Sequence, residues 1–189
     1  MAENYWQRSN IRIRGFEEKD MSMHIEKRNE ADSIQQLYYD KISLPRTRDE
    51  MEKELKKLQE DTTQNDKKIF VIETLDKKYV GEILIWFTDK QNSYFRYGIF
   101  INSDFRGNGY AKEALIIVLD YYFNELNYNK CSPTVYSFNE LSQQFHERFG
   151  FIQEGVLRNE WFARGKYFDI HYYGMLRDEF NRRYEHFKL

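Results

Sequence analysis

The chain has 189 residues, with 31 acidic and 29 basic side chains, so its formal net charge is -2. A protein that coats nucleic acid usually carries a strong basic excess, and this composition argues against that class. No run of sequence approaches the ~18 apolar residues that a membrane span needs, and the N-terminus has no apolar signal-peptide segment. Aromatic residues make up 17% of the chain, which indicates a folded protein because disordered chains are poor in them.

The organisation of the chain predicts one domain over residues 1–189. The sequence contains two prolines and nine glycines, and neither a linker nor an internal repeat divides it. Cys131 is its single cysteine, which excludes an intrachain disulfide and fits a reducing compartment. We therefore expect a cytoplasmic protein.

The first half of the chain predicts a helical segment followed by a meander of strands. Residues 16–44 are mixed in character and are expected to be helical in pieces, and the polar residues 61–68 to form a loop. Apolar and β-branched stretches joined by short turns indicate antiparallel strands. These strands are expected at residues 69–73, 79–87 and 94–101. Before the helical segment, the alternation of apolar and charged residues at 11–15 predicts a first strand.

Capping signals mark a further helix in this half. Thr47 is followed three residues later by Glu50, the spacing of a capping box at a helix start. Within that helix, Glu52 and Lys56 are four residues apart and are expected to form an ion pair.

The second half predicts helices alternating with short strands. The broad apolar stripe of residues 111–123 indicates a deeply buried helix, and residues 139–149 a second one that ends at Gly150. Pro133 lacks an N–H, so the strand after it should lie at an edge or be locally unpaired. The expected strands are residues 134–136, 156–158 and 167–176, followed by a terminal helix at 178–189. The fold class is α/β (α+β), a mixed sheet with helices on both faces.

The most informative segment runs from an apolar strand into Arg106–Gly109 and then directly into the buried helix. Glycines allow successive N–H groups to turn toward one point, and a helix N-terminus adds unpaired donors and partial positive charge. The segment is therefore a candidate cradle for a phosphate or pyrophosphate. A tight turn that needs positive φ would explain the glycines equally well. Lys112 stands where a dinucleotide fingerprint requires glycine.

These residues resemble the GNAT superfamily of acetyl-CoA-dependent N-acetyltransferases. Residues 106–111 read Arg-Gly-Asn-Gly-Tyr-Ala and match the family signature Gln/Arg-x-x-Gly-x-Gly/Ala. Further matches are typical of the branch that acetylates ribosomal-protein N-termini and polyamines. They are Asn139-x-x-Ser142, the segment Gly150–Arg158 and the segment Gly165–Tyr173. The resemblance extends from residue 11 to about residue 176.

The resemblance implies a mostly antiparallel sheet of about seven strands, in which the fourth and fifth splay apart to admit the pantetheine arm. It also implies acetyl-CoA as cosubstrate, without a metal, and transfer of the acetyl group to a primary amine. The residues expected to bind the coenzyme are Phe100, Ile101, Arg106, Gly107, Asn108, Gly109, Tyr110, Ala111 and Asn139.

Two residues are candidates for the general acid that protonates the departing thiolate. Ser142 and His146 share a helix face with Asn139, which by spacing alone indicates a solvated polar face with a helix cap. The family often has a tyrosine at the position of His146, and Ser142 matches a serine with that role, so the two rank equally. A histidine titrates near neutrality; if His146 is the acid, the rate should fall as the pH rises through its pKa.

The general base is less well marked. Many members of the family carry a glutamate where this chain has Arg96. Glu82 on the preceding strand is the nearest alternative, with Glu160 and Asp169 as further acids. Strand alternation alone favours Glu82 as an outward-facing residue, and Asp169 could equally have a structural role.

The acceptor is expected to be a small-molecule or peptide amine, either a protein N-terminus, a polyamine or another small amine. Acidic residues between positions 16 and 64 could attract such a cation, although they could equally be ordinary surface charge. They are Glu17, Glu18, Asp20, Glu26, Glu30 and Asp32. Neither a nucleic acid nor a membrane is an expected partner, and a homodimer is compatible with the aromatic-rich C-terminal segment. The alternative function is a non-catalytic sensor of acyl-CoA.

Overall fold

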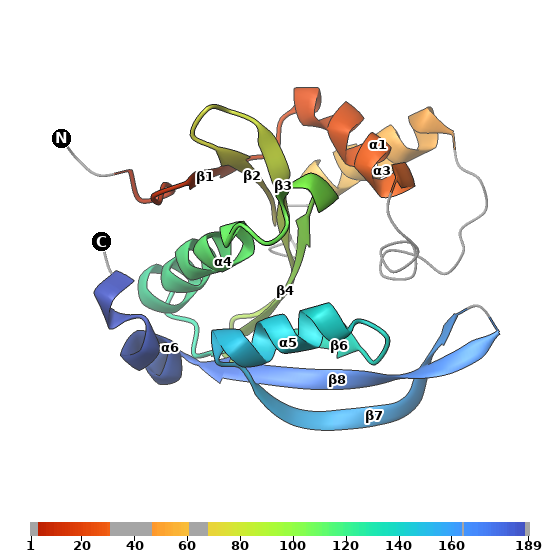
Figure 1. Ribbon diagram of the computed structural model, residues 1–189. Coiled ribbons are helices and arrows are strands. Elements are labelled where there is room, and N and C mark those ends of the chain that lie inside the picture. Colours follow the sequence, from red (N-terminus) through yellow and green to blue (C-terminus); the bar gives the residue numbers. More distant parts are fainter. Residues whose placement is uncertain (1–3, 31–46, 61–67, 164, 188–189) are drawn as a thin grey trace. The chain divides into compact units, whose positions relative to one another are not determined.

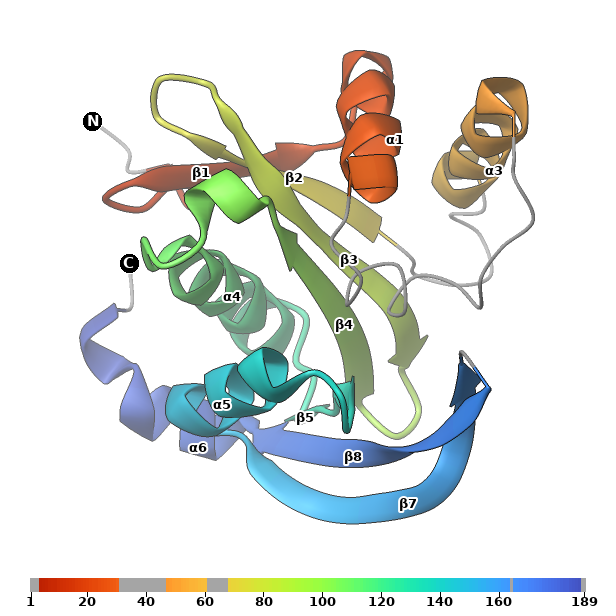
Figure 2. The same cartoon turned by 45° about the vertical axis from the view of Figure 1, so that its right-hand side comes forward.

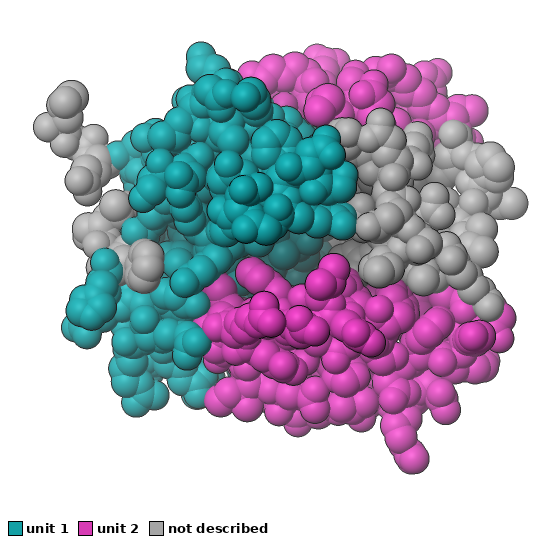
Figure 3. All heavy atoms as spheres, viewed as in Figure 1, with its two compact units in different colours: residues 1–16, 61–132, 175–189 teal, residues 17–60, 133–174 magenta. Residues whose placement is uncertain are grey.

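The computed structural model describes residues 4–30, 47–60, 68–163 and 165–187. The chain forms two compact units, each assembled from separate stretches of sequence (Figure 3). Unit 1 comprises Met1–Phe16, Asp61–Ser132 and Met175–Leu189, and unit 2 comprises Glu17–Glu60 and Pro133–Gly174. One domain over residues 1–189 stays a prediction.

The sheet of unit 1 is built on four antiparallel strands in chain order (Figure 1). They are β1 (Ile11–Gly15), β2 (Lys68–Thr74), β3 (Tyr79–Asp89) and β4 (Tyr94–Ile101). All four predicted strands are confirmed, as are the hairpins that join β2 to β3 and β3 to β4. Of the loop expected at residues 61–68, Lys68 belongs to β2 and the rest lies outside the described residues.

A short fifth strand, β5 (Lys130–Cys131), pairs in parallel with the first two residues of β4. With three further strands, β6 (Thr134–Tyr136), β7 (Ile152–Ala163) and β8 (Lys166–Leu176), the described residues form an eight-stranded sheet. Its strand order is β1-β2-β3-β4-β5-β8-β6, with β7 paired to β8. The expected number was about seven, because a two-residue strand is too short to show any periodicity. Among the described strands, β4 from Arg96 onward pairs with β3 alone.

Helix α4 (Tyr110–Asp120) contacts β1, β3 and β4 of unit 1. Its residues 114–120 are all buried, which confirms the deep burial that the wide apolar stripe predicted. The helix continues as a π-helical turn, η3 (Tyr121–Glu125), closed by a 3.0 Å bond from the Leu126 N–H to the Tyr121 carbonyl.

Segments near both ends of the chain pack around α4. Tyr5 donates a 2.7 Å hydrogen bond to the buried carboxylate of Asp120, which fastens the N-terminal arm to the helix. The terminal helix is α6 (Arg177–Arg183), followed by the 3-10 turn η4 (Glu185–Phe187), and it is therefore shorter than expected. Phe180 of α6 packs on Phe123, with ring centroids 5.5 Å apart.

The first part of unit 2 is helical, with η1 (Glu18–Asp20), α1 (Met21–Glu30) and α3 (Arg48–Glu60). The capping box is confirmed, because the Glu50 carboxylate accepts from the Thr47 N–H at 2.7 Å. The predicted Glu52–Lys56 pair is wrong: Glu52 pairs with Arg48, one turn earlier, at 2.8 Å. The rest of the segment expected to be helical in pieces, from residue 31 onward, lies outside the described residues.

The second part of unit 2 joins a helix to a long hairpin (Figure 2). Its elements are β6 (Thr134–Tyr136), α5 (Glu140–Phe149), β7 (Ile152–Ala163) and β8 (Lys166–Leu176). Among the strands that the structure describes, β6 pairs with β8 alone and ends the strand order, which confirms the edge position that Pro133 predicted. Strand β7 begins four residues earlier and ends five residues later than expected, since its two register shifts obscure the alternation.

We predict that Gly81→Ala destabilises unit 1. Gly81 lies opposite Ile101, and a Cβ at Gly81 would lie 2.0 Å from the Phe100 carbonyl oxygen, so β3 and β4 would have to move apart. Overpacking of this kind costs about 1–3 kcal/mol in the free energy of unfolding, which urea denaturation would measure. The matched control is Gly98→Ala in the same sheet, where a Cβ meets no atom within 4 Å. Equal effects of the two changes would contradict the prediction.

Candidate active site

The loop between β4 and α4 has the backbone conformation that only glycine adopts readily. After the 3-10 turn η2 (Ser103–Phe105), Gly107 and Gly109 have φ values of 81° and 80°. The need for positive φ is therefore confirmed. At neither position would a Cβ meet a heavy atom within 4 Å, so this side of the loop leaves room for a ligand to approach the backbone.

The same loop presents a group of backbone donors. Within the described part of the chain, the N–H groups of residues 107–111 donate to no other protein group. The Arg106 Nε atom donates to the Ile101 carbonyl at 3.1 Å, and the Asn108 amide donates to the Phe105 carbonyl at 3.2 Å. These bonds hold the loop while its N–H groups and the α4 N-terminus attract an anion. The loop thus fits the pyrophosphate of a coenzyme.

Glu82 is buried in unit 1, with 5% of its surface exposed. It accepts a 2.6 Å hydrogen bond from the Tyr79 hydroxyl and lies opposite Phe100 in the β3–β4 ladder. The outward-facing interpretation is wrong, because this central strand is covered on both faces. Tyr79 was missed as a partner of Glu82, since three residues along a strand ordinarily place two side chains on opposite faces.

Arg96, which stands where the family often has a glutamate, contacts aromatic rings. Its guanidinium lies 5.5 Å from the ring centroid of Trp86 and 5.7 Å from that of Phe87. These are cation–π distances, so the cation of this β4 residue packs against aromatic rings of β3.

The N-terminus of α5 in unit 2 is capped as the spacing predicted. The Asn139 side-chain oxygen accepts from the Ser142 N–H at 3.1 Å. The role of Asn139 in binding the coenzyme stays a prediction. Ser142 is half-buried, and its Oγ lies 3.4 Å from the His146 Nδ1, which confirms that the two side chains share a helix face.

His146 lies in the interior of unit 2, so the solvated-face interpretation is wrong for this residue. Only 3% of it is exposed, and its ring stacks on Tyr173 at a centroid distance of 5.6 Å. Its Nδ1 lies 2.7 Å from the Ser142 carbonyl oxygen, which assigns the Nδ1 proton to that bond. Burial lowers the pKa of His146 to about 4, and the bond to Ser142 opposes this shift only in part. The imidazole is therefore neutral at pH 7, and a fall in rate near neutrality is no longer expected from its titration.

The other acidic candidate, Asp169, is hydrogen-bonded within unit 2. Its carboxylate accepts from the Asn159 N–H at 2.9 Å, and its own N–H donates to the Ser137 hydroxyl at 3.2 Å. Asn159 has a φ of 54° in the irregular part of β7, so Asp169 holds a strained turn. Glu160 lies exposed on the same strand.

Cys131 is fully buried in β5, and burial raises the pKa of its thiol. Among the described residues, no group of three or more His, Cys, Asp or Glu side chains could hold a metal ion. In the part of the chain that the structure describes, no helix is long and apolar enough to cross a membrane.

We predict that Gly107→Ala and Gly109→Ala each weaken acetyl-CoA binding, because a Cβ strains a left-handed residue by about 1–2 kcal/mol and narrows the approach to the N–H groups. Arg106→Ala should weaken binding as well. Calorimetric titration with acetyl-CoA measures the affinity.

The matched control is Gly165→Ala. Gly165 has a φ of 73° and equally open surroundings, but it lies in the β7–β8 turn. This change should cost similar stability and spare coenzyme affinity. Unchanged affinity in all three loop variants would refute the cradle.

Comparison with known proteins identifies the family of this chain. Residues 10–152 match the family model of the acetyltransferase (GNAT) domain. A prophage-derived, uncharacterized N-acetyltransferase of Bacillus subtilis is 33% identical over 180 residues, covering 95% of this chain and 97% of the relative. A spermidine N(1)-acetyltransferase of Vibrio cholerae is 28% identical over 121 residues, covering 64% of this chain and 70% of the relative.

A crystal structure of the spermidine N-acetyltransferase from Vibrio cholerae, in complex with CoA and spermine, has the same fold. It superposes with a TM-score of 0.79 at 25% identity, covering 92% of this chain and 99% of that one. With the matched family model, the relative that spans almost the whole chain and the glycine loop in the expected conformation, this chain belongs to the GNAT family of acetyl-CoA-dependent N-acetyltransferases.

Proposed function

We propose that the amine acetylated by this enzyme is a polyamine of the spermidine class. The observation that carries the proposal is the match, over 92% of the chain, to an acetyltransferase whose crystal structure contains CoA and spermine. Relatives named as N-acetyltransferases favour catalysis over the alternative of a non-catalytic acyl-CoA sensor.

Negative charge in unit 2 supports a cationic acceptor, although not all the acids of this segment are available. Glu18 and Glu26 are exposed. Asp20 is buried and accepts a 2.8 Å bond from the Glu17 N–H, so it caps the turn before α1. Exposed carboxylates attract a polyvalent cation more strongly than a monoamine, because the field acts on each ammonium group.

Glu82 serves as the general base in this proposal. A polyamine nitrogen must lose a proton before it can attack, and a buried carboxylate beside Phe100 can receive that proton directly or through water. The amine lone pair then attacks the thioester carbonyl, and backbone N–H groups of β4 stabilise the oxyanion. The carbon–sulfur bond breaks, and the CoA thiolate leaves.

Ser142 is the better candidate to donate a hydrogen to the departing sulfur. Ser142 is half-buried on the first turn of α5, whereas His146 is buried and neutral. The His146 Nδ1–H is engaged with the Ser142 carbonyl, so His146 acts here as a positioning residue that supports the turn carrying Ser142. Both roles are proposals.

The setting of the enzyme is part of the proposal. We place it in the cytoplasm, where a reducing environment suits a buried free thiol such as Cys131. We also propose a homodimer, supported by exposed apolar side chains on the β7–β8 hairpin, including Ile152, Phe162 and Tyr167. Light scattering of the purified chain would test the dimer.

We predict that spermidine and spermine are acetylated with a kcat/KM at least about tenfold above that of butylamine and of a peptide with a free N-terminus, because they carry more charge. Release of the CoA thiol measures each rate. Saturable turnover of the peptide without turnover of polyamines would contradict the acceptor class while leaving acetyl transfer intact.

Ser142→Ala is expected to lower kcat by about ten- to a thousandfold and to spare acetyl-CoA affinity, because it removes a donor needed only as the sulfur leaves. Gln144→Ala, on the exposed side of the same helix, is the control. A silent Ser142→Ala together with a crippling His146→Phe would reverse the two assignments.

A further inference from the structure

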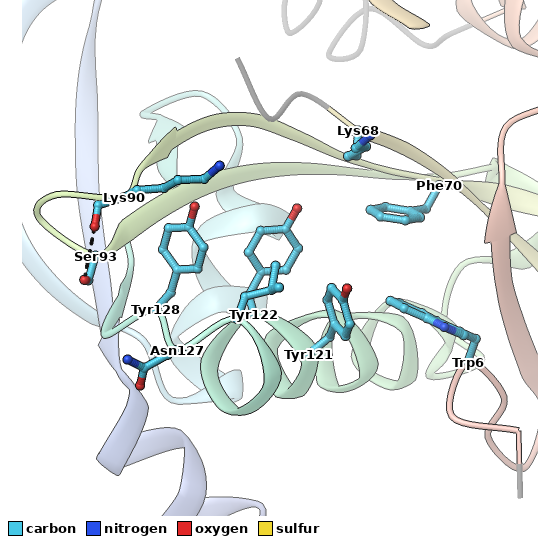
Figure 4. A pocket seen from close by; sticks show the side chains of 10 residues that line it. Trp6, Lys68, Phe70, Lys90, Ser93, Tyr121, Tyr122, Asn127 and Tyr128 are labelled. Carbon is cyan, nitrogen blue, oxygen red and sulfur yellow. Dashed lines mark hydrogen bonds between the residues drawn. The ribbon is translucent and has the colours of Figure 1, made fainter. Parts of the chain in front are cut away.

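Unit 1 contains a cavity of about 710 Å3 that is lined by residues outside the coenzyme loop (Figure 4). Its aromatic walls include Trp6 from the N-terminal arm, Phe70 from β2, and Tyr121 and Tyr122 from the π-helical turn after α4. A cavity of this size accommodates a small organic molecule.

The aromatic rings form a continuous row along one side of the cavity (Figure 4). The Trp6 ring lies 4.8 Å from that of Tyr121 and stacks on Phe70 at 5.9 Å, and Tyr122 lies 5.6 Å from Tyr128. Two successive tyrosines line the cavity at the point where the helix widens into a π turn. Such turns are frequent at functional sites. The row offers flat apolar surface to a flat ligand.

The charge of the cavity is positive. Lys68 at the start of β2 and Lys90 in the β3–β4 turn lie on its strand side (Figure 4), and both are exposed. Among the described residues that line it, none is acidic. Two ammonium groups above an aromatic row favour a ligand that is both flat and anionic.

We propose that this cavity binds a small aromatic anion of the aryl carboxylate class. The rings of Trp6 and Tyr121 contact the ring system of the ligand, and Lys68 and Lys90 face its carboxylate. The site is separate from the coenzyme loop, since α4 begins at that loop and its 11 residues, about 16 Å of helix, lead to the cavity.

The test uses the full chain and two probes that share a ring system, 2-naphthoate and the uncharged 2-naphthalenemethanol. We expect calorimetry to give a dissociation constant of the order of 0.1–1 mM for 2-naphthoate and at least about tenfold weaker binding of the alcohol. The double variant Lys68→Gln with Lys90→Gln should bind 2-naphthoate at least about tenfold more weakly and should bind the alcohol with unchanged affinity.

The matched control is Lys53→Gln with Lys166→Gln, which removes the same charge from exposed positions in unit 2. It should leave 2-naphthoate binding unchanged. CoA is itself an aromatic anion and would displace a probe that was bound at the coenzyme loop. Because the proposed cavity is separate from that loop, saturating CoA should leave the binding of 2-naphthoate unchanged. The proposal is overturned by absence of binding at millimolar concentration, by equal binding of the two probes, by equal effects of the two lysine pairs, or by displacement with CoA.

Discussion

Helix α4 is apolar around most of its circumference, and the arrangement of unit 1 follows from the need to cover it. The strands β1, β3 and β4 contact it, the N-terminal arm is fastened to it through Tyr5 and Asp120, and its π-helical extension packs on α6 through Phe123. A helix buried in this way is held rigidly. Both of its ends are therefore fixed, the first beside the glycine loop and the last beside the aromatic cavity.

Sequence periodicity was sufficient to predict the bounds of the elements whose contacts are local. The strands at residues 11–15, 94–101 and 134–136 have the predicted bounds, because alternation and short turns specify antiparallel hairpins and edges. Strand β5 could not be predicted, since two residues in parallel pairing depend on β4, more than thirty positions away. The Glu52 partner was wrong because Arg48 and Lys56 are equally spaced from it, and only the folded rotamers distinguish them.

The candidate site shows the same limit at the level of single side chains. The glycine loop could be predicted, because the conformation of Gly107 and Gly109 is a local property of the backbone. Burial of Glu82 and His146 depends on residues that other elements bring to them, Tyr173 of β8 in the case of His146. The periodicity of a sequence does not show which residues of other elements will pack on a polar side chain. The structure therefore changes which residue is the better candidate for the general acid, whereas the predicted coenzyme loop is unchanged.

The buried imidazole of His146 also links the stability of unit 2 to acidity. An unfolded chain would protonate this ring near pH 6.5, whereas in the folded chain its pKa is about 4, with burial as the main cause. Between these two pH values the unfolded state binds more protons than the folded state. The contribution of His146 to the free energy of unfolding is therefore fully present above about pH 6.5 and is lost as the pH falls toward 4. The decline approaches about 3 kcal/mol, a large share of the stability of an ordinary domain. One interior ring thus makes the folded state less stable in acid.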